Sequence, residues 1–129
     1  MSNDALLAAF ESATLETFHH ADHVHMAFIY LTRYPAPEGL ARFSSALARF
    51  AAAKGKPGLY HETITWAYFL LIRERMARAG GYPSWEAFAA ANPDLLNWKE
   101  SVLKKYYNEE TLASDLARAT FLMPDRVQP

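Results

Sequence analysis

The sequence predicts an all-α fold: a single domain over residues 1–129, built as a bundle of five to seven helices around a buried central helix at about residues 60–79. Three observations support this prediction. Between short breaks that contain Gly or Pro, apolar residues recur every three or four positions, which is the period of a helix. The stretch "ITWAYFLLI" (64–72) has one non-aromatic polar residue, and a helix that is apolar on all sides is typically buried. The chain has 129 residues and is 51% hydrophobic, which is enough for one core.

Three amphipathic helices are expected before the central one. The first begins after a capping Ser2 or Asn3 and runs to about residue 16. The second covers about residues 21–33 and ends before Pro35. The third, at about residues 38–53, has the clearest apolar stripe along one face.

The central stretch has a competing interpretation, because its Ile, Thr and aromatic residues also suit a buried strand. We favour a helix, since no other stretch is available as a partner strand and "RERMARAG" continues the helical period to a terminal glycine. After Gly81, shorter helical pieces are expected at about 85–92, 94–107 and 109–122.

The composition excludes several classes of function. The formal net charge is −1, so there is no basic excess for binding nucleic acid. The absence of cysteine excludes disulfides, thiolate metal sites and cysteine nucleophiles. Neither a signal peptide nor an apolar run of membrane-spanning length is evident, so we expect a cytoplasmic protein that does not bind a membrane. Apolar faces on the short terminal helices would allow a homodimer.

Four of the five histidines lie within "HHADHVH" (19–25), at the start of the second expected helix. His19 and His23 are four apart and His20 and His23 are three apart, so either pair lies on one helical face. Two imidazoles in this arrangement can bind one metal ion. Asp22 lies between them, where it can cap the helix or hold an imidazole proton. The spacing leaves open whether His19 or His20 faces inward.

The fifth histidine, His61, shares a face of the central helix with Thr65 and Tyr68. Their polar atoms need hydrogen-bond partners, because each buried unpaired group costs about 1–3 kcal/mol. The histidine-rich start of the second helix is the expected source of those partners. Tyr30 follows His23 along a semi-polar stripe and is a further candidate ligand-binding residue, with Thr65 and Tyr68.

These positions suggest a metal site formed by His20, His23 and His61, with Zn, Fe, Mn or Ni as the divalent ion. In that site Glu62 would be a fourth ligand or a catalytic acid/base, and His61 could also act as a general base. The competing interpretation of Glu62 is a carboxylate that interacts with the dipole at a helix start. Arg118 could donate to a buried acid or to an anionic ligand.

The patterns "FHHADHVHMAFIYL", "YHETITWAYFLLI" and "YYNEETLASDLARATFLMPD" together resemble a family of small helical bacterial proteins that is uncharacterised. The His-x-x-His start (His20, His23) and the Tyr-His-x-Thr-x-Thr start (60–65) carry the resemblance, which implies a helical fold and no particular activity.

Two classes of function follow from the residues. The first is a small, metal-dependent enzyme that acts on a small molecule in an internal His-rich pocket. The second is a non-catalytic helical module that binds a ligand or a protein, in which the His, Thr and Tyr cluster is structural. A helix-turn-helix that binds DNA is disfavoured, because no helix presents a basic recognition face.

Overall fold

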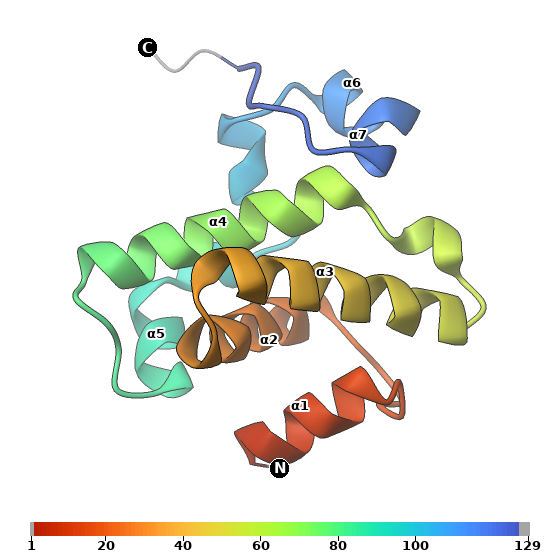
Figure 1. The fold of residues 1–129 in the computed structure, drawn as a ribbon. Coiled ribbons are helices and arrows are strands. Elements are labelled where there is room, and N and C mark those ends of the chain that lie inside the picture. The colour runs from red at the N-terminus through yellow and green to blue at the C-terminus, as the bar shows by residue number, and fades with distance from the viewer. Residues whose placement is uncertain (1, 127–129) are drawn as a thin grey trace.

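The structure is a computed structural model that describes residues 2–126. Over that range the chain is helical and has no β-strand, which confirms the predicted all-α class. None of the described helices is long and apolar enough to cross a lipid bilayer. The α-helices, shown in Figure 1, are α1 (Asn3–Glu11), α2 (His20–Arg33), α3 (Ala36–Ala53), α4 (Glu62–Arg78), α5 (Trp85–Ala91), α6 (Glu109–Leu112) and α7 (Asp115–Ala119). Short 3-10 turns occur at Pro57–Leu59, Pro93–Leu96 and Val102–Lys105.

Helices α2, α3 and α4 pack against one another and form the centre of the molecule. Helix α1 packs on α2 and α3, α5 lies against α2, and α6 and α7 lie on the far side of α4 (Figure 1). Stacked aromatic rings fill the space between the first three helices and α4, with Phe10, Phe43 and Phe69 fully buried. The core is therefore built from large rings, as the aromatic content of the sequence suggests.

A glycine favours the close approach of α3 to α4. A Cβ atom at Gly39 would lie 3.3 Å from Cζ of Phe69, which is tighter than an ordinary van der Waals contact. The missing side chain allows the start of α3 to pack directly on the middle of α4.

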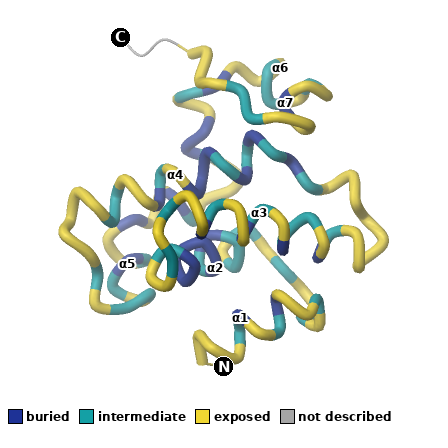
Figure 2. The backbone as a smooth tube through the Cα atoms, in the orientation of Figure 1, coloured by how far each residue is buried: buried dark blue, intermediate teal, exposed yellow. Residues whose placement is uncertain are grey.

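The prediction of a central helix at about 60–79 agrees with α4. Its first half contributes fully or nearly fully buried side chains, among them Thr63, Thr65 and Tyr68. Its second half is amphipathic, and Leu70 is partly exposed. Figure 2 shows the buried residues concentrated in α2 and in the first part of α4.

The C-terminal segment, residues 97–126, is less regular than the sequence suggested. The helical pieces expected at 94–107 and 109–122 are replaced by two 3-10 turns, two short α-helices and extended connections. Hydrogen bonds from α4 hold this segment in place. The Thr63 hydroxyl donates to the carbonyl of Thr120 at 2.8 Å and accepts from the backbone N–H of Leu122 at 3.1 Å. Tertiary contacts, not a repeating helical period, thus determine its path.

The polar atoms of α4 have different partners from those that the sequence suggested. His61 bonds the backbone at Leu112, and the Tyr68 hydroxyl lies 2.6 Å from the hydroxyl of Ser101. The expectation that these groups have hydrogen-bond partners is confirmed for both residues. Those partners come from the C-terminal segment and not from the start of α2.

Candidate functional site

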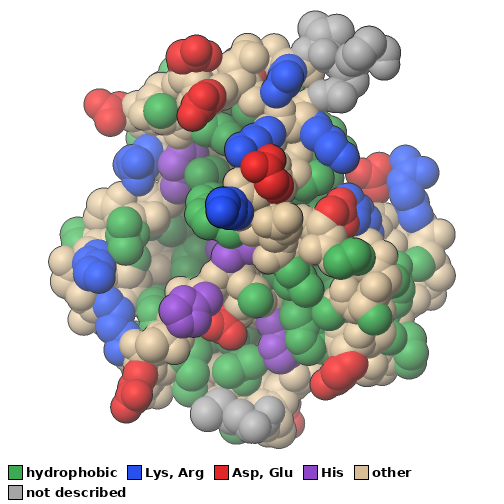
Figure 3. All heavy atoms as spheres, turned by 180° about the vertical axis from the view of Figure 1, so that it is seen from behind, with side chains coloured by type: hydrophobic (Ala, Val, Ile, Leu, Met, Phe, Trp, Pro, Cys, Tyr) green, Lys and Arg blue, Asp and Glu red, His purple; other side chains and the backbone are tan. Residues whose placement is uncertain are grey.

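A pocket of about 780 Å³ lies between the start of α2, the end of α3 and the start of α4. Its size lies within the range typical of small-molecule sites. On the face shown in Figure 3, histidine side chains gather around a hollow with hydrophobic side chains, and Lys and Arg side chains stand near its edge. The pocket is lined by Glu16, Thr17, Phe18, His19, His20, His23, Leu47, Phe50, Ala51, Lys54, Lys56, Leu59, Tyr60, His61, Ile64, Thr65, Trp98 and Arg118.

His23 is the most unusual polar residue of the pocket. Its Nε2 atom is buried and has no hydrogen-bond partner among the described residues. Its ring packs against the rings of Phe43, 5.2 Å away, and Tyr68, 6.2 Å away. Burial, together with a smaller contribution from the neighbouring His20, lowers the pKa of His23 to about 3, so the imidazole is neutral near pH 7.

His20 lies one turn earlier on α2 and lines the same pocket. Its Nε2 donates to the carbonyl of Leu95 at 2.8 Å, and its ring packs edge-on against Tyr68 at 4.7 Å. Burial lowers the pKa of His20, and the bond to Leu95 opposes that shift. His20 is therefore held in place by the protein, whereas the buried nitrogen of His23 is not.

His61 caps the start of α4, and both of its ring nitrogens are engaged. Nδ1 accepts the backbone N–H of Ile64 at 3.1 Å, so the proton of the neutral ring resides on Nε2. Nε2 donates that proton to the carbonyl of Leu112 at 2.7 Å. Burial lowers the pKa of His61, and the nearby Arg118 contributes to the same shift.

The three predicted metal ligands, His20, His23 and His61, line one pocket but do not form a ligand set. Among residues 2–126 no group of three or more His, Asp or Glu side chains is arranged to hold a metal ion. His61 has no free lone pair for a metal, and the Nε2 proton of His20 is committed to Leu95. The structure therefore gives no support to the predicted Zn, Fe, Mn or Ni site.

Glu62 occupies the first position of α4, where a carboxylate interacts favourably with the helix dipole. It accepts a hydrogen bond from the hydroxyl of Tyr60. Burial and this bond raise the pKa of the Tyr60 phenol. The Glu62 side chain does not line the pocket, whereas those of Tyr60 and the buried Thr65 do. The contacts of Glu62 therefore fit the helix-start interpretation better than an acid/base role.

The two tyrosines predicted to bind a ligand lie in different places. Tyr68 lies behind the pocket and supports the rings of His20, His23 and Trp98. Tyr30 is buried elsewhere, and its hydroxyl donates to the carboxylate of Glu11 at 2.7 Å. Tyr30 thus ties α2 to α1 and does not contact the pocket.

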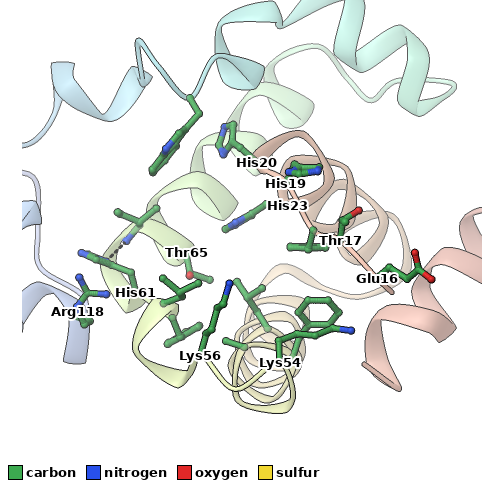
Figure 4. A pocket seen from close by; sticks show the side chains of 18 residues that line it. Glu16, Thr17, His19, His20, His23, Lys54, Lys56, His61, Thr65 and Arg118 are labelled. Atoms are coloured by element: carbon green, nitrogen blue, oxygen red, sulfur yellow. Dashed lines mark hydrogen bonds between the residues drawn. The ribbon is translucent and has the colours of Figure 1, made fainter. Parts of the chain in front are cut away.

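Charged side chains stand around the mouth of the pocket. In Figure 4, Lys56 extends from the loop after α3 over the hollow, with Arg118 on one side and Lys54 and Glu16 on the other. Arg118 donates to the carbonyl of Gly58 at 2.6 Å, which fixes α7 to this loop. The mouth carries three cationic side chains and one carboxylate, in a chain whose formal net charge is −1.

The sequence identifies the histidines and Thr65 as site residues but not most of the pocket. Lys54 and Lys56 stand in the break "KGKPG", and Trp98 stands in a stretch for which the sequence predicts a helix. Only Arg118 carried a signal, as a donor for an anionic ligand. The other lining residues are brought together by the packing of distant segments, which the helical period of the sequence does not predict.

No protein-family model, no curated protein and no solved structure matches this chain.

Proposed function

We propose that this chain binds a small, partly apolar molecule in the pocket between α2, α3 and α4, and that His23 forms a hydrogen bond with it. The observation that carries the proposal is the buried Nε2 of His23, which lacks a partner among the described residues. A buried polar atom in that state costs about 1–3 kcal/mol. A ligand that reaches this atom after a shift of the neighbouring side chains, and supplies the missing partner, would recover that free energy.

The walls of the pocket favour a ligand with an apolar body. Aromatic and aliphatic side chains line it, including Phe18, Phe50, Leu47, Ile64 and Trp98. A ligand that covers these side chains removes apolar surface from water, which favours binding by about 25 cal/mol for each Å² covered. The neutral His23 can donate or accept, so a hydroxyl or an N–H on the ligand would suit it.

Binding is favoured over general-base catalysis. A general base works best when its pKa lies near the working pH, whereas burial lowers the pKa of His23 to about 3. A metal-dependent reaction is disfavoured because His61 uses both ring nitrogens within the protein. The function that we propose is therefore non-catalytic ligand binding, and it differs from the alternative derived from the sequence in that His23 contacts the ligand.

The proposal is tested with three neutral probes: phenol, indole and 4-phenylbutan-1-ol. Binding to the wild-type chain is measured by isothermal titration calorimetry and by the shift in melting temperature. Ala51 lines the pocket from α3, so Ala51→Phe should obstruct it and reduce binding about tenfold or more. Ala41→Phe is the matched control, because Ala41 is an exposed residue of the same helix outside the pocket.

The expected result is binding of at least one probe to wild type and to Ala41→Phe, with the loss confined to Ala51→Phe. Circular dichroism shows whether both variants keep their helices. Failure of all three probes to bind the wild-type chain, or unchanged binding to a folded Ala51→Phe, would contradict the proposal.

A further inference from the structure

We propose that the ligand of this pocket is a small organic anion, with its charged group at the mouth and its apolar body inside. This inference rests on the proposed function and deepens it by naming the chemical class of the ligand. Three observations support it: the cations around the mouth, their position relative to the one carboxylate of the lining, and the exposed apolar side chains at the mouth.

The cations at the mouth are available to a ligand. Lys54, Lys56 and Arg118 all line the pocket, and the ion pairs within residues 2–126 involve other side chains. Arg118 uses one N–H for the carbonyl of Gly58, and a guanidinium has five. A concave site with an excess of one sign of charge concentrates ligands of the opposite sign.

The single carboxylate of the lining is set apart from most of this positive charge. Glu16 belongs to the connection before α2, and Figure 4 shows it on the opposite side of the pocket from Arg118. Lys56 extends between them, on the side of the pocket where α3 ends and α4 begins. A charged group bound near Lys56 and Arg118 would therefore gain attraction without facing Glu16.

Two large apolar side chains at the mouth remain exposed. The exposed fractions of Leu59 and Trp98 are 69% and 52%, and both residues line the pocket. The ring of Trp98 packs against that of His20, with 5.0 Å between the two ring centroids. An exposed leucine and an exposed indole in a lining that also holds cations match a ligand that is apolar and anionic at once.

The test compares two probes with the same body, 4-phenylbutan-1-ol and 4-phenylbutanoate, by calorimetry at low ionic strength. One ion pair at about 4 Å contributes roughly 1 kcal/mol in water and more when partly buried. We therefore expect the carboxylate to bind about five- to tenfold more tightly than the alcohol, with a smaller preference at high salt.

Lys56→Gln should abolish most of this preference. Lys105→Gln is the matched control, because it changes the net charge equally from an exposed position outside the pocket. Loss of the preference in Lys56→Gln alone supports the inference. Equal binding of both probes, or equal effects of the two substitutions, overturns it and leaves the proposed function intact. Failure of both probes and of the other neutral probes overturns the two together.

Discussion

Replacing His23 by leucine should stabilise the folded chain, although changes at buried side chains usually destabilise a protein. The Nε2 atom of His23 is buried and lacks a hydrogen-bond partner among the described residues. Leucine has a similar size and no polar atom, so the substitution removes an unpaired group and keeps the packing. The expected gain in the free energy of unfolding is about 1–3 kcal/mol near neutral pH.

The gain should increase as the pH falls, because burial lowers the pKa of His23 from 6.5 to about 3. Between these two values the unfolded chain binds a proton that the folded chain does not. Keeping the ring neutral therefore costs no stability above about pH 6.5, and stability is lost as the pH falls through this window. At about pH 5 the loss amounts to about 2 kcal/mol, and the leucine variant avoids it.

The assay is urea unfolding followed by circular dichroism, at about pH 7.5 and about pH 5. His20→Leu is the control, since it makes the same change one turn away on α2. It removes the bond to the carbonyl of Leu95 and should destabilise the chain by about 1–3 kcal/mol. If His23→Leu instead destabilises the chain as His20→Leu does, or gains equally at both pH values, the reasoning about the unpaired nitrogen is refuted.

Four further predictions follow from other contacts. Thr63→Val removes the bonds to Thr120 and Leu122 and should lower the free energy of urea unfolding by about 1–3 kcal/mol. Amide exchange in the C-terminal segment should become faster, and unchanged exchange there would contradict the anchoring role of Thr63. The bond from Arg75 lowers the pKa of Asp94, so the ionised Asp94 stabilises the fold above its unfolded pKa, and this stabilisation is lost as the pH falls through the lower folded value. In Asp94→Asn the free energy of unfolding should therefore fall less steeply in acid. An unchanged acid dependence would argue against the ion pair of Arg75 and Asp94. Glu16→Gln should strengthen binding of 4-phenylbutanoate about two- to fivefold and leave that of 4-phenylbutan-1-ol unchanged, whereas an equal effect on both would argue against a charge effect. Tyr30→Phe should leave binding of either probe unchanged, because its hydroxyl bonds Glu11 outside the pocket; weaker binding would restore Tyr30 as a ligand-binding residue.

The first two thirds of the fold could be predicted from sequence because local signals agree there. The apolar period places α2 to α4 within a few residues of their observed bounds, whereas α1 ends at Glu11, earlier than the expected end near residue 16. Ser2 caps α1, and α2 ends before Pro35, as expected. The C-terminal segment could not be predicted in the same way. Its short turns are held by bonds to α4, such as that of Thr63, and such long-range contacts leave no period in the sequence.

The site could be predicted only in part, for a related reason. Burial of the polar face of α4 was foreseeable, because His61, Thr65 and Tyr68 share one side of an apolar helix. Their partners were not foreseeable. A histidine that caps a helix and a histidine left unpaired look the same in sequence, since the difference lies in which backbone groups reach them. The cations of the mouth come from loops and from α7, and only the folded chain brings them together.

The most direct test of the pocket is an NMR titration of the imidazole resonances of His23 with 4-phenylbutanoate. His25 serves as the internal reference, because it lies on the same helix but stacks on Trp85 at 4.4 Å, outside the pocket. We expect the His23 resonances to shift in proportion to occupancy while those of His25 stay constant. Saturating probe that leaves His23 unchanged, or that shifts both histidines equally, would contradict it.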